Sequence, residues 1–117
     1  MWEVEYYESR NNESPVETFI DKLDTKTKAK ILWTIDLLRL EGNNLREPYT
    51  KHLQNGIFEL RIKSPNNIIR ILHFFQSGKK IILTNGFIKK TQKTPANEIE
   101  KAEKYKQDYI GRLKQYD

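Results

Sequence analysis

The chain has 117 residues, of which 37% are hydrophobic and 32% charged, a balance that predicts one small globular domain over residues 1–117. Two Trp, six Tyr and five Phe exclude a wholly disordered chain, and the lack of cysteine excludes disulfides, thiolate zinc sites and cysteine nucleophiles. No apolar run is long enough to cross a membrane, and the first residues do not resemble a secretory signal. We therefore expect a cytoplasmic protein with no membrane partner.

The net charge of +5 is concentrated in one segment of the chain. Residues 51–94 carry nine basic residues and a single acidic one, Glu59, whereas residues 1–50 carry seven basic and ten acidic residues. A block of one sign indicates either a polyanionic partner or a disordered tail. Because the same segment is the most apolar part of the chain, we exclude the tail and expect a polyanion as partner.

The N-terminal half predicts a strand followed by two helices. Residues 2–7 are typical of a strand, and residues 14–23 predict a short helix that opens with a capping box and a proline in its first turn. Residues 25–41 predict a longer helix that ends at a glycine. Its apolar stripe is formed by Ile31, Ile35 and Leu38, widened by Leu32.

The C-terminal half predicts a loop, three strands and a helix. Residues 43–54 are expected to form the loop, and residues 57–63, 68–75 and 80–87 the strands. Short turns between the strands imply an antiparallel meander. The last helix is predicted from Thr94 and Pro95 to the end of the chain. The fold class is therefore α+β, with an N-terminal strand and a helical hairpin packed on the meander, helices against one sheet face, and a C-terminal helix.

Period-two alternation separates apolar and charged side chains within the strands. On residues 57–63, the charged face carries Glu59, Arg61 and Lys63, and the other face is apolar. In the following strand, Arg70 interrupts an apolar run. An arginine at such a position is costly unless it reaches solvent or an opposite charge.

Two interpretations of these charged residues remain open. In the first, Arg61 pairs with Glu59 or with a neighbouring strand, Arg70 extends to water, and both have structural roles only. In the second, the charged residues converge on an open face that binds phosphate, and Phe74 or Phe87 is available for base stacking. The charge balance favours this second interpretation, in which the groove contains Glu59, Arg61, Lys63, Arg70, Lys89, Lys90 and Lys93.

The two histidines have different expected roles. His73 falls on an apolar strand face, where a half-buried ring with satisfied hydrogen bonds is the usual outcome. His52 lies in the predicted loop before the first basic strand, from which it reaches the edge of the groove. Two histidines, dispersed carboxylates and no cysteine give none of the usual metal-ligand spacings, so we expect neither a metal site nor a cofactor.

Four segments resemble the HigB-type branch of the RelE/ParE toxin superfamily. They are residues 57–61 (I-F-E-L-R), 69–72 (I-R-I-L), 85–95 (N-G-F-I-K-K-T-Q-K-T-P) and 98–102 (E-I-E-K-A). The resemblance implies a microbial RNase-like fold and the toxin of a type II toxin–antitoxin system. Such toxins are typically ribosome-dependent endoribonucleases that cut messenger RNA in the ribosomal A site without a metal. The implied partner is a HigA-type helix-turn-helix antitoxin, through which alone the toxin contacts operator DNA.

The resemblance also implies roles for individual residues. Arg61 and Arg70 match strand positions where the family places cations around the scissile phosphate, and Glu59 matches the acid of the E-L-R motif. Lys89 and Lys90 match the basic end of the last strand. We therefore expect Arg61, Arg70, Lys90 and Glu59 to be catalytic, and Lys63, Lys89, Lys93, His52 and Phe87 to bind RNA.

Several points remain open at this level. The general base is Glu59, a lysine or His52. A ParE-like inhibitor of DNA gyrase shares the fold without hydrolysing anything, and a non-catalytic RNA-binding module has the same groove without a base. The basic segment favours the endoribonuclease, because a gyrase inhibitor has no need to gather cations on its sheet. Removing any one of Arg61, Arg70 and Lys90 is expected to change the free energy of unfolding by less than about 1 kcal/mol.

Overall fold

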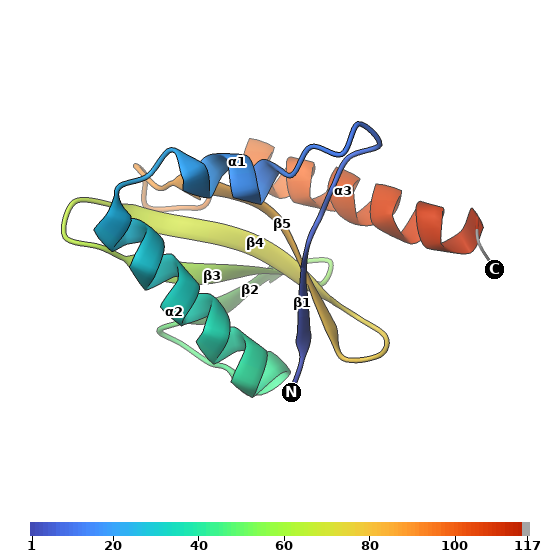
Figure 1. Cartoon of the computed structure of the whole chain (residues 1–117), viewed down its shortest axis with the longest axis horizontal. Coiled ribbons are helices and arrows are strands. Elements are labelled where there is room, and N and C mark those ends of the chain that lie inside the picture. The colour runs from blue at the N-terminus through green and yellow to red at the C-terminus, as the bar shows by residue number, and fades with distance from the viewer. Residues whose placement is uncertain (116–117) are drawn as a thin grey trace.

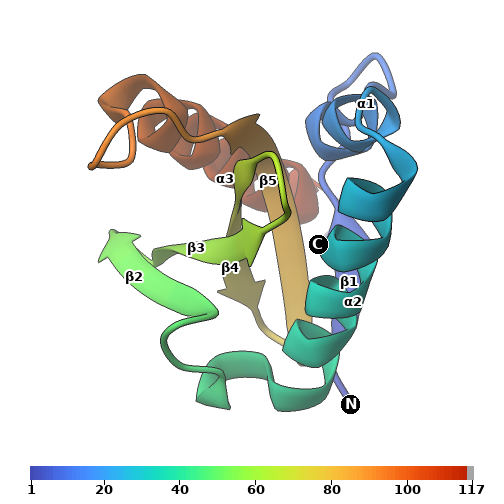
Figure 2. The ribbon, with the colours of Figure 1, turned by 90° about the vertical axis from the view of Figure 1, so that its left-hand side faces the viewer.

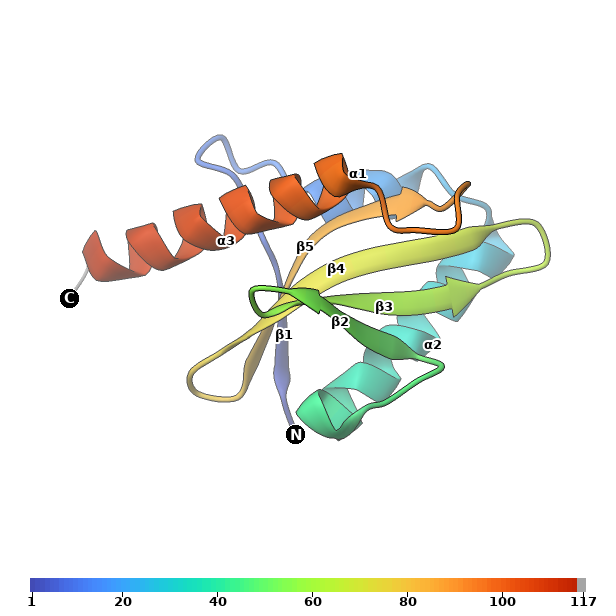
Figure 3. The same cartoon turned by 180° about the vertical axis from the view of Figure 1, so that it is seen from behind.

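The computed structural model of this protein describes residues 1–115 as an α+β fold built on a five-stranded sheet with the order β1-β5-β4-β3-β2. Helices α1 and α2 cover one face of this sheet, and α3 crosses the other face (Figures 1 and 3). The elements are β1 (Glu3–Tyr6), α1 (Pro15–Asp21), α2 (Thr25–Glu41), the short 3-10 helix η1 (Gly42–Asn44), β2 (Thr50–Gln54), β3 (Ile57–Lys63), β4 (Ile68–Gln76), β5 (Lys80–Ile88) and α3 (Ala96–Gln115). The predicted fold class is confirmed. No helix in the described part of the chain is both long and apolar enough to span a membrane.

The sheet contains one strand that the sequence did not predict. Residues 50–54 were expected to lie in a loop, but they form β2, which pairs antiparallel with β3 and places Lys51 opposite Glu59. The segment is polar and has little local strand signal. An edge strand needs no such signal, because pairing with its neighbour can hold it in place. The three strands of the meander are confirmed, whereas β1 runs parallel to β5, so the sheet is mixed.

The face under α1 and α2 holds the larger apolar cluster. Its buried members come from both helices and from β3, β4 and β5, and they include Ile31, Ile35 and Leu38, as predicted. Ser14 caps α1 by accepting a hydrogen bond from the amide of Glu17, 3.2 Å away. Leu32 does not belong to this core, because 51% of its surface is exposed.

The opposite face is covered by α3, which corrects the expectation that helices lie against one face only. Figure 2 shows α1 and α2 together on one side of the sheet. Ala102 of α3 is fully buried in a second cluster, against which Tyr105 and Tyr109 also pack. The strands supply apolar side chains to both faces, as in sheets that are covered on both sides. The strand members of this second cluster are Ile57, Leu72, Phe74 and Ile82.

A bulge in β5 determines which face its last residues occupy. The register runs from His73 opposite Leu83 to Leu72 opposite Asn85, so Thr84 has no direct partner on β4. The Thr84 hydroxyl donates a hydrogen bond to the Leu72 carbonyl, 3.1 Å away. The extra residue reverses the alternation and places Phe87 on the same face as Arg70.

Candidate functional site

The candidate site lies on the α3 face of the sheet, at the ends of β3, β4 and β5. Arg61 of β3 and Arg70 of β4 are direct cross-strand partners and therefore share this face. Like charges at directly opposed positions destabilise a sheet unless an opposite charge compensates them. The compensation comes from Glu59, two residues before Arg61 on the same strand.

Glu59 is a buried hub that holds both arginines. Only 1% of the side chain is exposed, and its Oε2 accepts a hydrogen bond from Arg61 Nε at 3.0 Å and lies 3.3 Å from Arg70 Nε. The other oxygen, Oε1, accepts a hydrogen bond from the hydroxyl of Thr94. Burial alone raises the pKa of Glu59, but the bonds from Thr94 and Arg61 and the charge of Arg70 outweigh it and leave this pKa below its usual range. Glu59 is therefore ionised at neutral pH.

The Nε ends of both guanidinium groups face the carboxylate, whereas the terminal nitrogens of Arg61 remain available. Both Nε atoms face Glu59, and Arg70 Nη1 donates to the Ile69 carbonyl at 3.0 Å. The terminal nitrogens of Arg61 make no hydrogen bond to any residue of the described chain, 1–115. The Arg61 side chain is 25% exposed and that of Arg70 is 12% exposed. The site thus presents two adjacent cations whose positions are fixed from behind.

These contacts test the structural interpretation of the two arginines. The pairing of Arg61 with Glu59 is confirmed. The expectation that Arg70 extends into water is wrong, because its side chain is mostly buried and its Nε lies beside the same carboxylate. The pairing does not close the site, since one carboxylate faces two guanidinium groups.

Lys89 is the lysine most closely associated with this pair. It follows directly after β5, where its amide donates to the Ile68 carbonyl at 2.7 Å. Burial and then the charge of Arg70 lower the pKa of Lys89, and Arg61 and Lys51 add to this effect against the opposing influence of Glu59. A lysine with a lowered pKa is a better proton acceptor at neutral pH than an ordinary one.

Three hollows open around the two arginines and Lys89. One, of about 300 Å³, is lined by residues of β2 and of the segment after β5, together with Glu59 and Arg61. A second, of about 630 Å³, lies between Arg70 and residues 89–92. The third, of about 600 Å³, runs from both arginines toward α2.

The remaining predicted site residues line the hollows around the two arginines or pack beneath α3. Lys90 and Lys93 are exposed on the segment after β5 and line the second and first hollows respectively, and Lys63 is exposed at the end of β3 and lines the third. Phe87 lies opposite Arg70 in the sheet and packs into the cluster beneath α3.

His52 lies at the rim of the first hollow, but its ring is engaged elsewhere. It is on β2 rather than in a loop, and its ring centroid is 4.9 Å from that of its cross-strand partner Phe58. Its Nε2 accepts a hydrogen bond from the Gly56 amide at 3.3 Å. Since β2 partners share a face, the ring lies on the face opposite to Glu59.

His73 differs from its expected half-buried and satisfied state. It is fully buried between Phe58 and Phe75, and neither ring nitrogen makes a hydrogen bond of normal geometry to residues 1–115. Burial lowers the pKa of His73 to about 4, against a smaller opposing contribution from the Ile71 backbone. The neutral ring is therefore part of the core.

Sequence reasoning missed two residues that support the site. Thr94 was predicted only as a helix cap, but its hydroxyl anchors the basic segment after β5 to Glu59. Lys51, opposite Glu59 on β2, was assigned to a loop. The sequence feature that could have identified Lys51 is its position at the start of the basic segment 51–94. Within residues 1–115, no group of three or more histidines and carboxylates is arranged to hold a metal ion.

Comparison with known proteins identifies a family. The family model described as "Phage derived protein Gp49-like (DUF891)" matches residues 18–107, which is more than half of the 117 residues and includes all the charged residues of the site. No protein of curated function matches the chain. The chain therefore belongs to the phage-derived Gp49-like family, a toxin-like family related to toxins of the RelE and HigB type.

Proposed function

We propose that this protein is the toxin of a type II toxin–antitoxin system and that it cleaves messenger RNA on the ribosome as an endoribonuclease. The observation that carries the proposal is the arginine pair on adjacent strands, which one buried carboxylate holds from behind. Its outer nitrogens lie beside hollows lined by further cations. Membership of a toxin-like family supports the same conclusion.

The proposed reaction is transfer of the phosphate to the neighbouring ribose hydroxyl. The 2′-oxygen bonds to phosphorus as the bond from phosphorus to the 5′-oxygen breaks, leaving a 2′,3′-cyclic phosphate and a 5′-hydroxyl. Negative charge grows on the phosphate oxygens in the transition state, where fixed cations stabilise it most effectively. Arg61 and Arg70 supply these cations as planar donors that can bind phosphate bidentately.

The proposal assigns the proton transfer to Lys89 and a positioning role to Glu59. Lys89 takes the proton from the 2′-hydroxyl, and a proton from solvent reaches the leaving 5′-oxygen. The lowered pKa of Lys89 supports this role. Glu59 is less suited to be the base, because it is 1% exposed and both its oxygens are engaged. The His52 ring is directed toward Phe58 and Gly56. The reaction as proposed needs no metal.

The proposed partner is a HigA-type antitoxin with a helix-turn-helix domain. A toxin-like family implies an antitoxin. We propose that it presents acidic and apolar residues to the basic segment 51–94, which would otherwise bind RNA non-specifically. In this proposal, operator DNA is contacted by the antitoxin and not by the toxin.

The test is induction of the wild type, Arg61→Ala and Arg70→Ala in bacteria, with growth, RNA 5′ ends and gyrase supercoiling measured in parallel. We expect the wild type to stop growth and create new RNA 5′ ends, and each variant to cleave about 100-fold more slowly, as when a fixed transition-state donor is lost. The control is Lys114→Ala, which removes an exposed lysine from α3.

Two outcomes would contradict the proposal. Loss of gyrase supercoiling without RNA cleavage would make the protein a gyrase inhibitor. Full cleavage by both arginine variants would show that the reaction takes place elsewhere.

A further inference from the structure

One hollow has a composition that cleavage of a single phosphate does not explain. It lies between α2, the residues before β2 and the turn end of the β3–β4 hairpin, and its volume is about 600 Å³. Within residues 1–115, four cationic side chains line it and no carboxylate does. Two of them, Lys30 and Lys63, are exposed, and the others are Arg61 and Arg70 of the candidate site.

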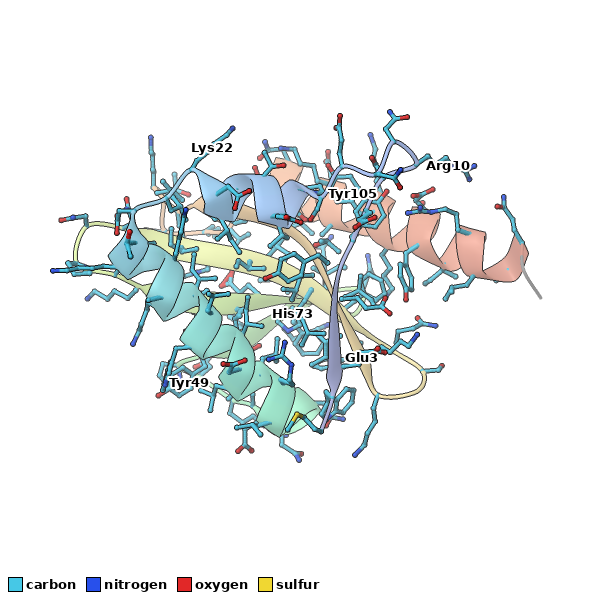
Figure 4. All side chains as sticks on the ribbon, viewed as in Figure 1. Glu3, Arg10, Lys22, Tyr49, His73 and Tyr105 are labelled. Carbon is cyan, nitrogen blue, oxygen red and sulfur yellow. The ribbon has the colours of Figure 1, made fainter. Side chains whose placement is uncertain are left out.

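The walls of this hollow are apolar and partly aromatic. Pro48 and Tyr49 come from the segment before β2, and Ile62 and Ile68 from the ends of β3 and β4. The Tyr49 side chain lies beside α2 at the edge of the sheet, with its ring 6.3 Å from that of Trp33 (Figure 4). Tyr49 remains 36% exposed although its own carbonyl is fixed by the Arg61 amide at 2.7 Å. An exposed ring on a fixed backbone is a suitable surface for a flat apolar group.

Charge and shape together indicate the class of ligand. Lys30 and Lys63 form no ion pair with a carboxylate of residues 1–115, and Arg61 and Arg70 share the single carboxylate of Glu59, so the hollow favours an anion. Its apolar walls favour a flat, uncharged part attached to that anion. A nucleotide has both parts, and single-stranded RNA is commonly bound by aromatic stacking beside a cationic track. Because Arg61 and Arg70 line this hollow and also form the candidate site, a phosphate at the arginines would leave the adjoining nucleoside within reach of Tyr49.

We infer that the hollow between α2 and the β3–β4 hairpin is a nucleotide subsite that holds the nucleoside adjoining the scissile phosphate. Tyr49 stacks on its base, and Lys30 and Lys63 contact the next phosphate along the strand. This inference rests on the proposed function, because it assumes that the arginines bind an RNA phosphate. It adds that the protein recognises a stretch of single-stranded RNA longer than one phosphodiester.

The test is the affinity of the purified protein for inorganic phosphate and for oligoribonucleotides of two to six residues, made uncleavable by a 2′-O-methyl group at every position. We expect wild-type affinity to rise with length and then to level off. Tyr49→Ala should weaken binding of every oligonucleotide, the dinucleotide included, by about 10-fold, as expected for loss of one base–aromatic stack, and Tyr49→Phe should retain the affinity. Lys30→Ala should weaken the longer oligonucleotides and lower the salt dependence of binding by about one counterion.

The control is Lys114→Ala, which removes the same charge from a part of α3 that lines none of the three hollows. Equal affinity of the wild type and Tyr49→Ala at every length would overturn the subsite. The same holds if Tyr49→Ala weakens binding of inorganic phosphate as much as binding of the oligonucleotides, because Tyr49 would then act on the folded structure. Failure of the proposed function gives a different result, in which the wild type binds no oligonucleotide at any length.

Discussion

The two faces of the sheet carry out different tasks with the same strands. Toward α1 and α2, β3 presents Leu60 and Ile62, which are at most 1% exposed within a continuous apolar cluster. Toward α3, the same strand presents Ile57 under the helix and then Glu59 and Arg61 beyond it. The comparison shows that one face is scaffold, whereas the other is divided between scaffold and site. Mutations on the two faces should therefore have separable consequences for stability and activity.

The largest expected effect is on the scaffold face. Ile35 of α2 is 2% exposed in the centre of the apolar cluster. Ile35→Asp should lower the free energy of unfolding by more than about 3 kcal/mol, because it buries an unpaired charge. Denaturant unfolding measures this change. The matched control is Leu32→Asp on the exposed side of the same helix, which should change stability by less than about 0.5 kcal/mol. Equal effects of the two variants would contradict the helix orientation.

The next effect is a pH dependence from His73, which also lies on the scaffold face. Its pKa is about 4 in the folded protein, and the unfolded value is about 6.5. Between these values the unfolded chain binds more protons, so stability is fully present above pH ~6.5 and is lost as the pH falls toward 4, by about 3 kcal/mol in all. Unfolding free energies measured from pH 7 to pH 4 test this prediction. His73→Leu should remove most of the slope, and an unchanged slope would assign it to other groups.

A smaller loss of stability is expected at the hub of the site face. Glu59→Gln removes the negative charge that compensates two directly opposed arginines. We expect the free energy of unfolding to fall by about 2 kcal/mol. RNA cleavage should fall as well, because the arginines lose their fixed positions. Unfolding and cleavage assays on one preparation give both values. Glu100→Gln, at an exposed position of α3, serves as the control. A stable but inactive Glu59→Gln would instead favour direct chemistry by the carboxylate.

The fold was largely predictable from the sequence because its signals are local and consistent. A capping box defined the start of α1, helical spacing and a closing glycine defined α2, and turn residues and alternation defined β3 to β5. The strand β2 and the parallel pairing of β1 were missed, since they depend on long-range pairing and not on local pattern. The coverage of the second face was missed although Leu72 and Phe74 on that face required a partner.

The candidate site was predictable as a set of residues but not as an arrangement. The charged residues of β3 and β4 could be placed on one face by alternation, and the structure confirms that Arg61 and Arg70 meet there. The depth of Glu59 and its bond from Thr94 join segments 35 residues apart in the chain, and no spacing rule predicts such a contact. That buried carboxylate changes the expectation that Arg61, Arg70 or Lys90 can each be removed at a cost below about 1 kcal/mol.

The smallest effects form a graded series that tests how the site face is divided. The Arg70 side chain is 12% exposed beside Glu59, that of Arg61 is 25% exposed with free outer nitrogens, and Lys90 is exposed. Replacement of Arg70 by Ala should therefore lower stability most, by about 2 kcal/mol, because it leaves a buried carboxylate with one partner fewer. Arg61→Ala should cost about 1 kcal/mol or less, and Lys90→Ala should have no measurable effect.

Cleavage should not follow the same order as stability. Arg61 and Arg70 both face the proposed phosphate position, so both variants should lose about 100-fold in cleavage although their stabilities differ. No residue of the described part of the chain fixes the Lys90 side chain in this way, and its removal should weaken RNA binding more than the reaction itself. Thermal melting and single-turnover cleavage on the three variants separate the two quantities. If cleavage instead declined in proportion to stability across the series, the arginines would act only by holding the fold, and the site face would be scaffold throughout.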